Sequence, residues 1–234
     1  RQAQLRMLPD PLEYESIRCE HRIYPSLMLS GDFLDYFELG DNQLAFYIAD
    51  VSGHGASSAF VTVLLKNLTY RLRRNRQRGS SDDLIHPARV LDRINSELLA
   101  SELEKHLTMF YGVINTRTLQ MRYSVGGHFP MPVLLDGEGG RYLEGRGMPV
   151  GLFSEARYEE YQVALQKNFA LLMFSDGILE IMKESTLNDK EAMLLNVAVR
   201  SAGDLSRIAT ELGAGTTGDL PDDIALMAVR RGRL

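Results

Sequence analysis

The 234-residue sequence contains a single cysteine, Cys19, and no tryptophan. One thiol can form neither an intrachain disulfide nor the set of thiolates that holds a structural zinc ion. Chains without disulfides are typical of reducing compartments, so we expect a cytoplasmic protein.

Long apolar runs and a strong charge imbalance are absent as well. No segment approaches the roughly 20 apolar residues that span a bilayer, and the first residues lack the basic-then-apolar pattern of a signal peptide. The formal net charge is only −5, so the chain as a whole has no strong field that would attract nucleic acid or an anionic membrane. We expect neither of them as a partner.

The composition suits a globular protein. Hydrophobic residues make up 44% of the chain, which is enough for a substantial core in one domain. Residues 2–8 form a helix-like phrase that ends at Pro9 and Pro11. We interpret residues 1–10 as the end of a linker helix from an upstream domain, and residues 11–234 as a single domain.

Short segments with the composition of β-strands recur along the chain. Between residues 119 and 125 apolar and polar residues alternate, the period-2 pattern of a strand with one buried face. A turn at 115–118 joins this segment to the preceding one as a hairpin, and the glycines of 136–140 predict a second hairpin loop. The predicted strands are 17–24, 33–39, 44–49, 109–115, 119–125, 132–135, 158–165, 169–174 and 224–230.

Helical spacing of apolar residues predicts helices over 57–78, 87–105, 189–199 and 204–212. These helices come in blocks and do not follow every strand. Strands in runs with helices in separate blocks favour an α+β fold. We expect antiparallel sheets packed face to face, with helices outside.

Four aspartates stand beside small or turn residues at the ends of predicted strands: Asp32, Asp50, Asp176 and Asp222. The near-continuous apolar runs before Asp50 and Asp176 indicate central strands that are buried on both faces. A carboxylate that emerges from such a strand needs a cation. Any one of these aspartates is explained equally well as a turn residue or helix N-cap, but four together favour a metal site.

Oxygen ligands without a histidine or cysteine cluster favour Mg²⁺ or Mn²⁺ over zinc. Two such ions that share a carboxylate can hold a bridging water, lower its pKa and bind a phosphate for in-line attack. This chemistry requires no covalent enzyme intermediate.

Five motifs, in this order and spacing, resemble the PPM-type metal-dependent phosphatases of the bacterial SpoIIE/RsbU branch. They are Gly31-Asp32-Phe33, Asp50-Val51-Ser52-Gly53-His54-Gly55, Gly126-Gly127-His128-Phe129-Pro130, Ser175-Asp176-Gly177-Ile178-Leu179-Glu180 and Asp222-Asp223-Ile224. The resemblance covers nearly the whole chain. It implies an antiparallel β-sandwich flanked by helices on both faces, in α-β-β-α layers, with the metals at one end.

Carried over residue by residue, the resemblance implies two Mn²⁺ or Mg²⁺ ions bridged by Asp50. Asp32 and the backbone carbonyl of Val51 would bind one ion, and Asp176 with Asp222 the other. The same four aspartates are therefore the expected catalytic residues.

Two departures from the family pattern remove no ligand. Ala225 stands where the family often has threonine, and Gly126 where it usually has alanine. Whether Asp222 or Asp223 is the ligand stays open.

The resemblance further implies hydrolysis of phosphoserine or phosphothreonine on a regulatory protein, an anti-anti-sigma factor, as the output of a bacterial signalling protein. An upstream receiver or sensor domain and a homodimer through the N-terminal linker belong to the same expectation. The alternative is a phosphatase-like adaptor that binds a sigma factor or its antagonist without catalysis. A two-metal nuclease is disfavoured, because no basic stripe lies beside the acidic motifs.

Other polar residues have two interpretations each. His54 is a catalytic acid or a residue that packs the turn, and His128 is assigned a structural role. Asp35 either holds a metal-bound water or faces solvent. The arginine-rich run 71–78 could bind an acidic partner, but we favour a solvated helix end that complements the helix dipole.

Overall fold

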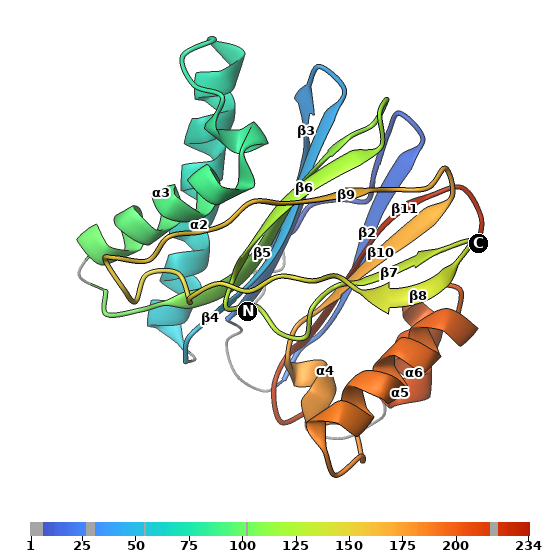
Figure 1. Ribbon diagram of the computed structural model, residues 1–234. Coiled ribbons are helices and arrows are strands. Elements are labelled where there is room, and N and C mark those ends of the chain that lie inside the picture. Colours follow the sequence, from blue (N-terminus) through green and yellow to red (C-terminus); the bar gives the residue numbers. More distant parts are fainter. Residues whose placement is uncertain (1–6, 27–30, 54, 102, 216–219) are drawn as a thin grey trace. The chain divides into compact units, whose positions relative to one another are not determined.

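The computed structural model describes residues 7–26, 31–53, 55–101, 103–215 and 220–234. The chain forms two compact units. The first comprises Arg1–Pro9, Leu29–His128 and Gly145–Ala164, and the second comprises Asp10–Met28, Phe129–Glu144 and Leu165–Leu234. Each unit has its own antiparallel sheet and its own helices (Figure 1).

The sheet of the first unit has the strand order β3-β4-β5-β6-β9. Every neighbouring pair in it is antiparallel. The strands β3, β4 and β5 extend the predicted ones, β6 is shifted by one residue, and β9 is shorter than predicted at both ends. The strands are β3 (Asp32–Gly40), β4 (Gln43–Val51), β5 (Leu107–Asn115), β6 (Gln120–Gly126) and β9 (Tyr161–Ala164).

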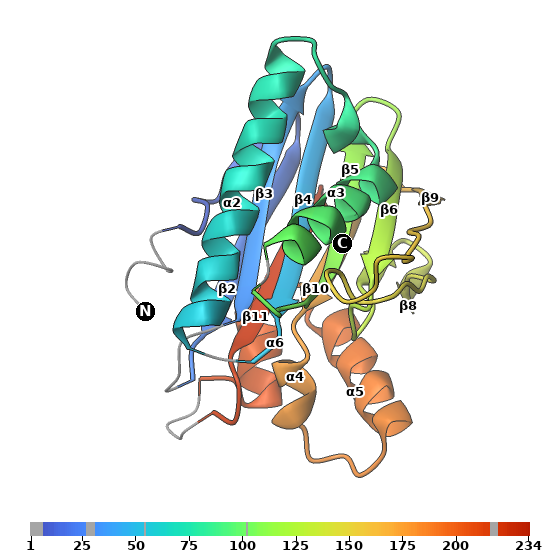
Figure 2. The same ribbon diagram turned by 90° about the vertical axis from the view of Figure 1, so that its left-hand side faces the viewer.

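Two α-helices, α2 (Ala56–Gln77) and α3 (Pro87–Ala100), cover one face of this sheet, with a 3₁₀ turn η1 (Asp83–Ile85) between them. Figure 2 shows α2 lying along β3 and β4. The helix α3 ends before the predicted Lys105. Glu104 has a φ of 50°, in the left-handed region that does not continue a helix, and the chain must extend to enter β5.

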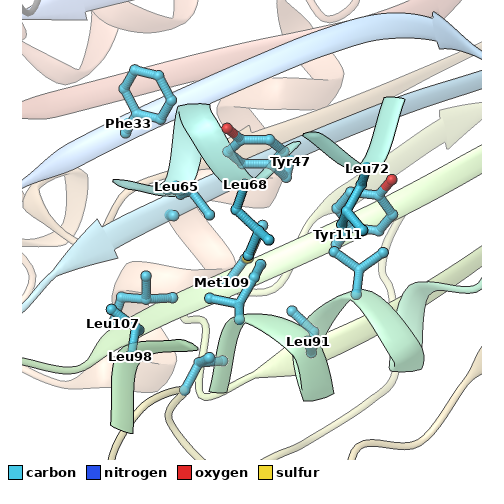
Figure 3. Packing of buried hydrophobic residues seen from close by; sticks show 14 of the residues in the cluster. Phe33, Tyr47, Leu65, Leu68, Leu72, Leu91, Leu98, Leu107, Met109 and Tyr111 are labelled. Atoms are coloured by element: carbon cyan, nitrogen blue, oxygen red, sulfur yellow. The ribbon is translucent and has the colours of Figure 1, made fainter. Parts of the chain in front are cut away.

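The face under the helices carries every second residue of the central strands. Figure 3 shows Tyr47 and Tyr111 among the leucines of α2 and α3, with their rings stacked 6.2 Å apart. The Tyr111 hydroxyl donates to the carbonyl of Leu84 in η1 at 2.8 Å. On the opposite face Ile48 is buried as well, which confirms that β4 is a doubly buried strand.

The sheet of the second unit has the order β1-β2-β11-β10-β7-β8, again antiparallel throughout. The sequence predicted four of these strands but missed β1 and β8, which are only three and four residues long. The predicted hairpin loop lies between β7 and β8, where Asp136 pairs with Gly139. The strands are β1 (Leu12–Tyr14), β2 (Ile17–Tyr24), β7 (Val133–Asp136), β8 (Gly139–Tyr142), β10 (Phe169–Phe174) and β11 (Ile224–Arg231).

Three helices belong to the second unit: α4 (Gly177–Glu180), α5 (Leu187–Arg200) and α6 (Leu205–Leu212). The Thr186 side chain caps α5 by accepting from Asp189 N, and Asp204 caps α6 by accepting from Arg207 N. These caps explain why both helices begin close to the predicted residues. The single turn of α4 is too short to show a periodic pattern in the sequence.

The predicted α+β class with antiparallel sheets and helices is confirmed. In the described part of the chain there are five α-helices, none of them long and apolar enough to cross a membrane. Most of the predicted N-terminal helix 2–8 lies outside the described residues. Met7 and Leu8 are not helical and pack, partly buried, against the core of the first unit.

Candidate metal centre

Asp32 and Asp50 face each other across the first two strands of the first unit. They are direct partners in the register of β3 and β4. Val51 N donates to Gly31 O at 3.1 Å, which makes Asp32 and Asp50 a non-hydrogen-bonded pair, the kind whose Cα atoms lie only about 4.5 Å apart. Both carboxylates therefore leave the same face of the sheet side by side.

The carbonyl oxygen of Val51 lies close to Gly31 and to the Asp50 carboxylate. A Cβ atom on Gly31 would stand 2.4 Å from the Val51 carbonyl oxygen and 2.9 Å from Asp50 Oδ1. Two of the proposed ligand oxygens thus converge on space that only a glycine leaves open. Carboxylate and carbonyl oxygens are the donors that Mg²⁺ and Mn²⁺ prefer, so this donor set fits the predicted ions.

The loop after Val51 is held by groups from α2 and from the segment before β5. The Ser52 carbonyl accepts from Lys105 Nζ and from Ser58 Oγ, both at 3.1 Å. Ser52 N donates to His106 O at 2.9 Å. Lys105 was missed by the sequence analysis because it lies 53 residues from Ser52 and no motif contains it. His54 lies outside the described residues.

In the second unit, Asp176 and Asp222 are brought together by the pairing of β10 with β11. Asp176 follows β10 as the N-cap residue of α4, and Asp222 stands two residues before β11, the strand that pairs with β10. Ser175 joins the two turns, since its N–H donates to Ala225 O and its Oγ accepts from Ala225 N, both at 2.9 Å. A Cβ on Gly177 would stand 2.1 Å from the Asp223 carbonyl, so these backbones meet without room for a side chain.

Asp222 and Asp223 have different surroundings. Asp223 is only 3% exposed, and its Oδ1 accepts from Ser26 N at 2.5 Å. Asp222 is exposed, and its Oδ1 accepts from Asp223 N at 2.7 Å. The Asp223 carboxylate is therefore engaged in the fold of the second unit, whereas Asp222 lies at the surface.

Negative charge accumulates around Asp176. Burial and the nearby Asp222 raise the pKa of Asp176, and burial together with Asp222 and Asp176 raises the pKa of Glu180. Glu180 lies one turn after Asp176 on α4. The sequence analysis did not single it out, although it belongs to the Ser175–Glu180 motif. A cation at this place would relieve the repulsion.

A cavity of about 350 Å³ opens beside Asp176 and Glu180. Its other walls come from Phe129, Leu187 and Lys190. The Lys190 ammonium group is held by the Leu179 carbonyl at 2.7 Å. This arrangement leaves room for a side chain of another molecule next to the Asp176 carboxylate.

Within the described residues, no three histidine, cysteine, aspartate or glutamate side chains are placed to hold one ion. The first unit brings Asp32 and Asp50 together, and the second brings Asp176 and Asp222 together. That all four serve one two-metal centre stays a prediction.

Asp35 is neither solvent-facing nor on the Asp32 side of the sheet. It is 4% exposed, and its Oδ2 accepts from Lys66 Nζ of α2 at 2.6 Å. Because side chains alternate along a strand, Asp35 and Asp32 lie on opposite faces of β3. The interpretation of Asp35 as a solvent-facing residue is therefore wrong, and its position does not support a role next to Asp32.

His128 is 5% exposed, and the centre of its ring lies 6.3 Å from the centre of the Phe110 ring. Burial lowers its pKa to about 4, so the imidazole is neutral at physiological pH. This environment agrees with the predicted structural role. The neighbouring departure at Gly126 also has a packing reason, because a Cβ there would stand 2.5 Å from Val150 Cγ2.

Comparisons with known proteins show the family and the fold of this chain. A family model described as Stage II sporulation protein E (SpoIIE) matches residues 40–232. Two curated relatives come from Bacillus subtilis. The phosphoserine phosphatase RsbP is 25% identical over 186 residues, which cover 77% of this chain and 44% of the relative. The phosphoserine phosphatase RsbU is 28% identical over 163 residues, which cover 69% and 46%. The chain thus spans less than half the length of these relatives.

Among solved structures, the SiaA-PP2C domain of Pseudomonas aeruginosa matches with a TM-score of 0.74 at 19% identity. The match covers 92% of this chain and 86% of that structure. At this identity the likeness establishes the fold.

Proposed function

The chain belongs to the SpoIIE family, and we propose that it hydrolyses phosphoserine or phosphothreonine on a regulatory protein with two Mn²⁺ or Mg²⁺ ions. The observation that carries the proposal is the facing pair of Asp32 and Asp50, with the Val51 carbonyl converging on the space at Gly31. Three oxygens from two adjacent strands suit a hard divalent cation.

Each candidate ligand has a distinct role in this proposal. By the family resemblance, Asp50 would be shared by both ions, Asp32 and the Val51 carbonyl would hold the first, and Asp176 with Asp222 would hold the second. When bound, such ions acidify a water and neutralise the phosphate that it attacks. Lys105 and Ser58 keep the loop after Val51 in place through the Ser52 carbonyl.

The finer assignments follow the family resemblance. We propose an anti-anti-sigma factor as the phosphoprotein substrate, a receiver or sensor domain upstream, a homodimer through the N-terminal linker and a cytoplasmic location. The names of RsbP and RsbU support a phosphoserine substrate.

Metal removal tests the proposal. We expect the protein to hydrolyse p-nitrophenyl phosphate and a phosphoserine peptide with millimolar Mn²⁺, and a chelator to lower both rates about 100-fold or more, because the attacking water depends on the ions. A phosphotyrosine peptide serves as the specificity control. Absence of turnover in a folded protein with Mn²⁺ would favour the non-catalytic adaptor, and turnover that survives the chelator would contradict the metal mechanism.

Alanine substitutions at Asp222 and Asp223 separate ligand from structural carboxylate. Asp222→Ala is expected to lower Mn²⁺-dependent turnover while the free energy of unfolding stays nearly unchanged, because Asp222 is exposed. Asp223→Ala removes the acceptor of Ser26 N and is expected to lower the free energy of unfolding by about 1–3 kcal/mol. Urea unfolding and turnover of the same preparations provide both measurements. A stable but inactive Asp223→Ala would reassign the ligand to Asp223.

A further inference from the structure

A groove runs between the C-terminal half of α2 and the helix α3 in the first unit. Its volume is about 290 Å³. Leu68 and Leu72, both nearly buried, form part of its lining. The charged residues that line it are Arg71 and Arg74 from α2, Arg78 at the C-cap of α2, and Arg93 and Glu97 from α3.

The helix dipole accounts for only part of this collection of charge. A cation complements the dipole only within the last turn of a helix. Arg74 lies in the last turn of α2 and Arg78 is its C-cap residue, so the dipole favours both. Arg71 lies before the last turn, and Arg93 belongs to another helix. The spacing of Arg71, Arg74 and Arg78 instead places all three on one face of α2, toward the groove.

The neighbouring arginines of the same run are used differently. Arg76 pairs with Asp41 and Asp82 and donates to the Leu39 carbonyl at 3.0 Å. The Arg73 guanidinium lies 4.7 Å from the centre of the Phe37 ring. These two arginines attach α2 to its own sheet and the nearby turns.

The groove itself keeps an excess of positive charge. Arg71 pairs with Glu97 at 2.9 Å, and Arg93 pairs with Asp83 at 3.0 Å. In the part of the chain that the structure describes, Arg74 and Arg78 form no ion pair, and Arg74 lies 5.9 Å from the Tyr70 ring centre. Four arginines against one glutamate put a net charge of +3 on the lining, in a chain whose net charge is −5.

The groove is remote from the candidate metal ligands of its own unit. Arg76 follows the groove residue Asn75 and contacts Leu39 near the end of β3. Asp32 lies at the other end of that strand. Leu39 is seven residue steps from Asp32, which is about 23 Å at roughly 3.3 Å per residue. The arginines of the groove are therefore not a phosphate site of the proposed metal centre.

We propose that this groove docks an acidic segment of a protein partner, whose carboxylates pair with Arg74 and Arg78. Guanidinium groups bind carboxylates through two parallel hydrogen bonds, which suits the aspartate and glutamate side chains of such a segment. A polypeptide suits the groove better than nucleic acid, since Glu97 and Asp83 would repel a continuous line of phosphates.

Fluorescence anisotropy with a labelled peptide rich in aspartate and glutamate tests the proposal without depending on catalysis. We expect the protein to bind this peptide, and the double variant Arg74→Glu/Arg78→Glu to bind it about tenfold more weakly. Higher ionic strength should weaken binding to the unmodified protein. The matched control is Arg117→Glu/Arg233→Glu, which makes the same charge change at two exposed arginines outside the groove. Its affinity should stay within about twofold.

Three results would overturn the proposal. They are no binding of the acidic peptide, equal weakening in both double variants, or tighter groove-dependent binding of an oligonucleotide of equal charge, which would make nucleic acid the ligand. Thermal melts check that each variant is folded. If the glutamate variant does not fold, Arg74→Gln/Arg78→Gln provides the same comparison.

Discussion

Asp50→Asn is expected to lower Mn²⁺-dependent hydrolysis of p-nitrophenyl phosphate at least about 100-fold, because the proposed bridging ligand loses its charge. The amide has the same shape as the carboxylate, so the pairing of β3 with β4 should persist. Asp50 also faces Asp32 directly, and two close carboxylates repel each other when no cation lies between them. The variant should therefore be at least as stable as the unmodified protein without metal.

Thermal melts with and without Mn²⁺ distinguish loss of metal from loss of structure. The unmodified protein should melt at a higher temperature with Mn²⁺, since an ion that binds only the folded state stabilises it. Asp50→Asn should lose most of this increase. Asp10→Asn, at an exposed aspartate outside the candidate site, is the control. Full activity of Asp50→Asn would refute the proposed bridging role.

Lys66→Met is expected to lower the free energy of unfolding at pH 8 by about 3 kcal/mol, the cost of leaving a buried carboxylate without its partner. The Asp35 side chain is 6% exposed and lies 2.6 Å from Lys66 Nζ, whose side chain is 36% exposed. Methionine keeps most of the aliphatic packing on Phe33, which lies under the ammonium group. The loss should therefore come mainly from the charge.

The pH dependence identifies the cause. Burial raises the pKa of Asp35 above its usual value of 3.8, and Lys66 opposes this increase. A carboxyl whose pKa is raised by folding binds its proton more tightly in the folded state, so the stability it contributes is lost as the pH rises through the folded pKa. Removing Lys66 raises this pKa further. The difference between variant and unmodified protein should grow as the pH rises from about 5 to about 8.

Urea unfolding at both pH values measures this difference. Lys66→Arg keeps the charge and should retain most of the stability. Asp35→Asn/Lys66→Met should lose less than Lys66→Met alone, because no buried charge remains. A loss that is the same at pH 5 and pH 8 would indicate lost packing in place of an unpaired charge.

Local patterns in the sequence were sufficient for the longer elements. The strands 17–24 and 169–174 have the predicted bounds. The helix α2 differs from its prediction by one residue at each end. The short elements β1, β8 and α4 were missed, since three or four residues carry no measurable period.

The four candidate aspartates were named from the sequence alone, since each stands beside small or turn residues at the end of a strand, whereas Val51 came from the family resemblance. The structure added which carboxylates face each other. Asp32 and Asp50 meet through the register of two strands, and Asp223 is held by Ser26, which lies 197 residues away. A partner so far away in the chain cannot be predicted from the residues around Asp223.

The same distinction applies to the charged residues. The sequence by itself determined that arginines cluster at the end of α2 and that Asp35 lies in a strand. Only the tertiary structure decided that Arg93 of α3 joins Arg74 in one groove and that Asp35 pairs with Lys66. The physical reason is that periodicity reports how one segment is buried, whereas the partner of a charge depends on how segments far apart in the chain pack together.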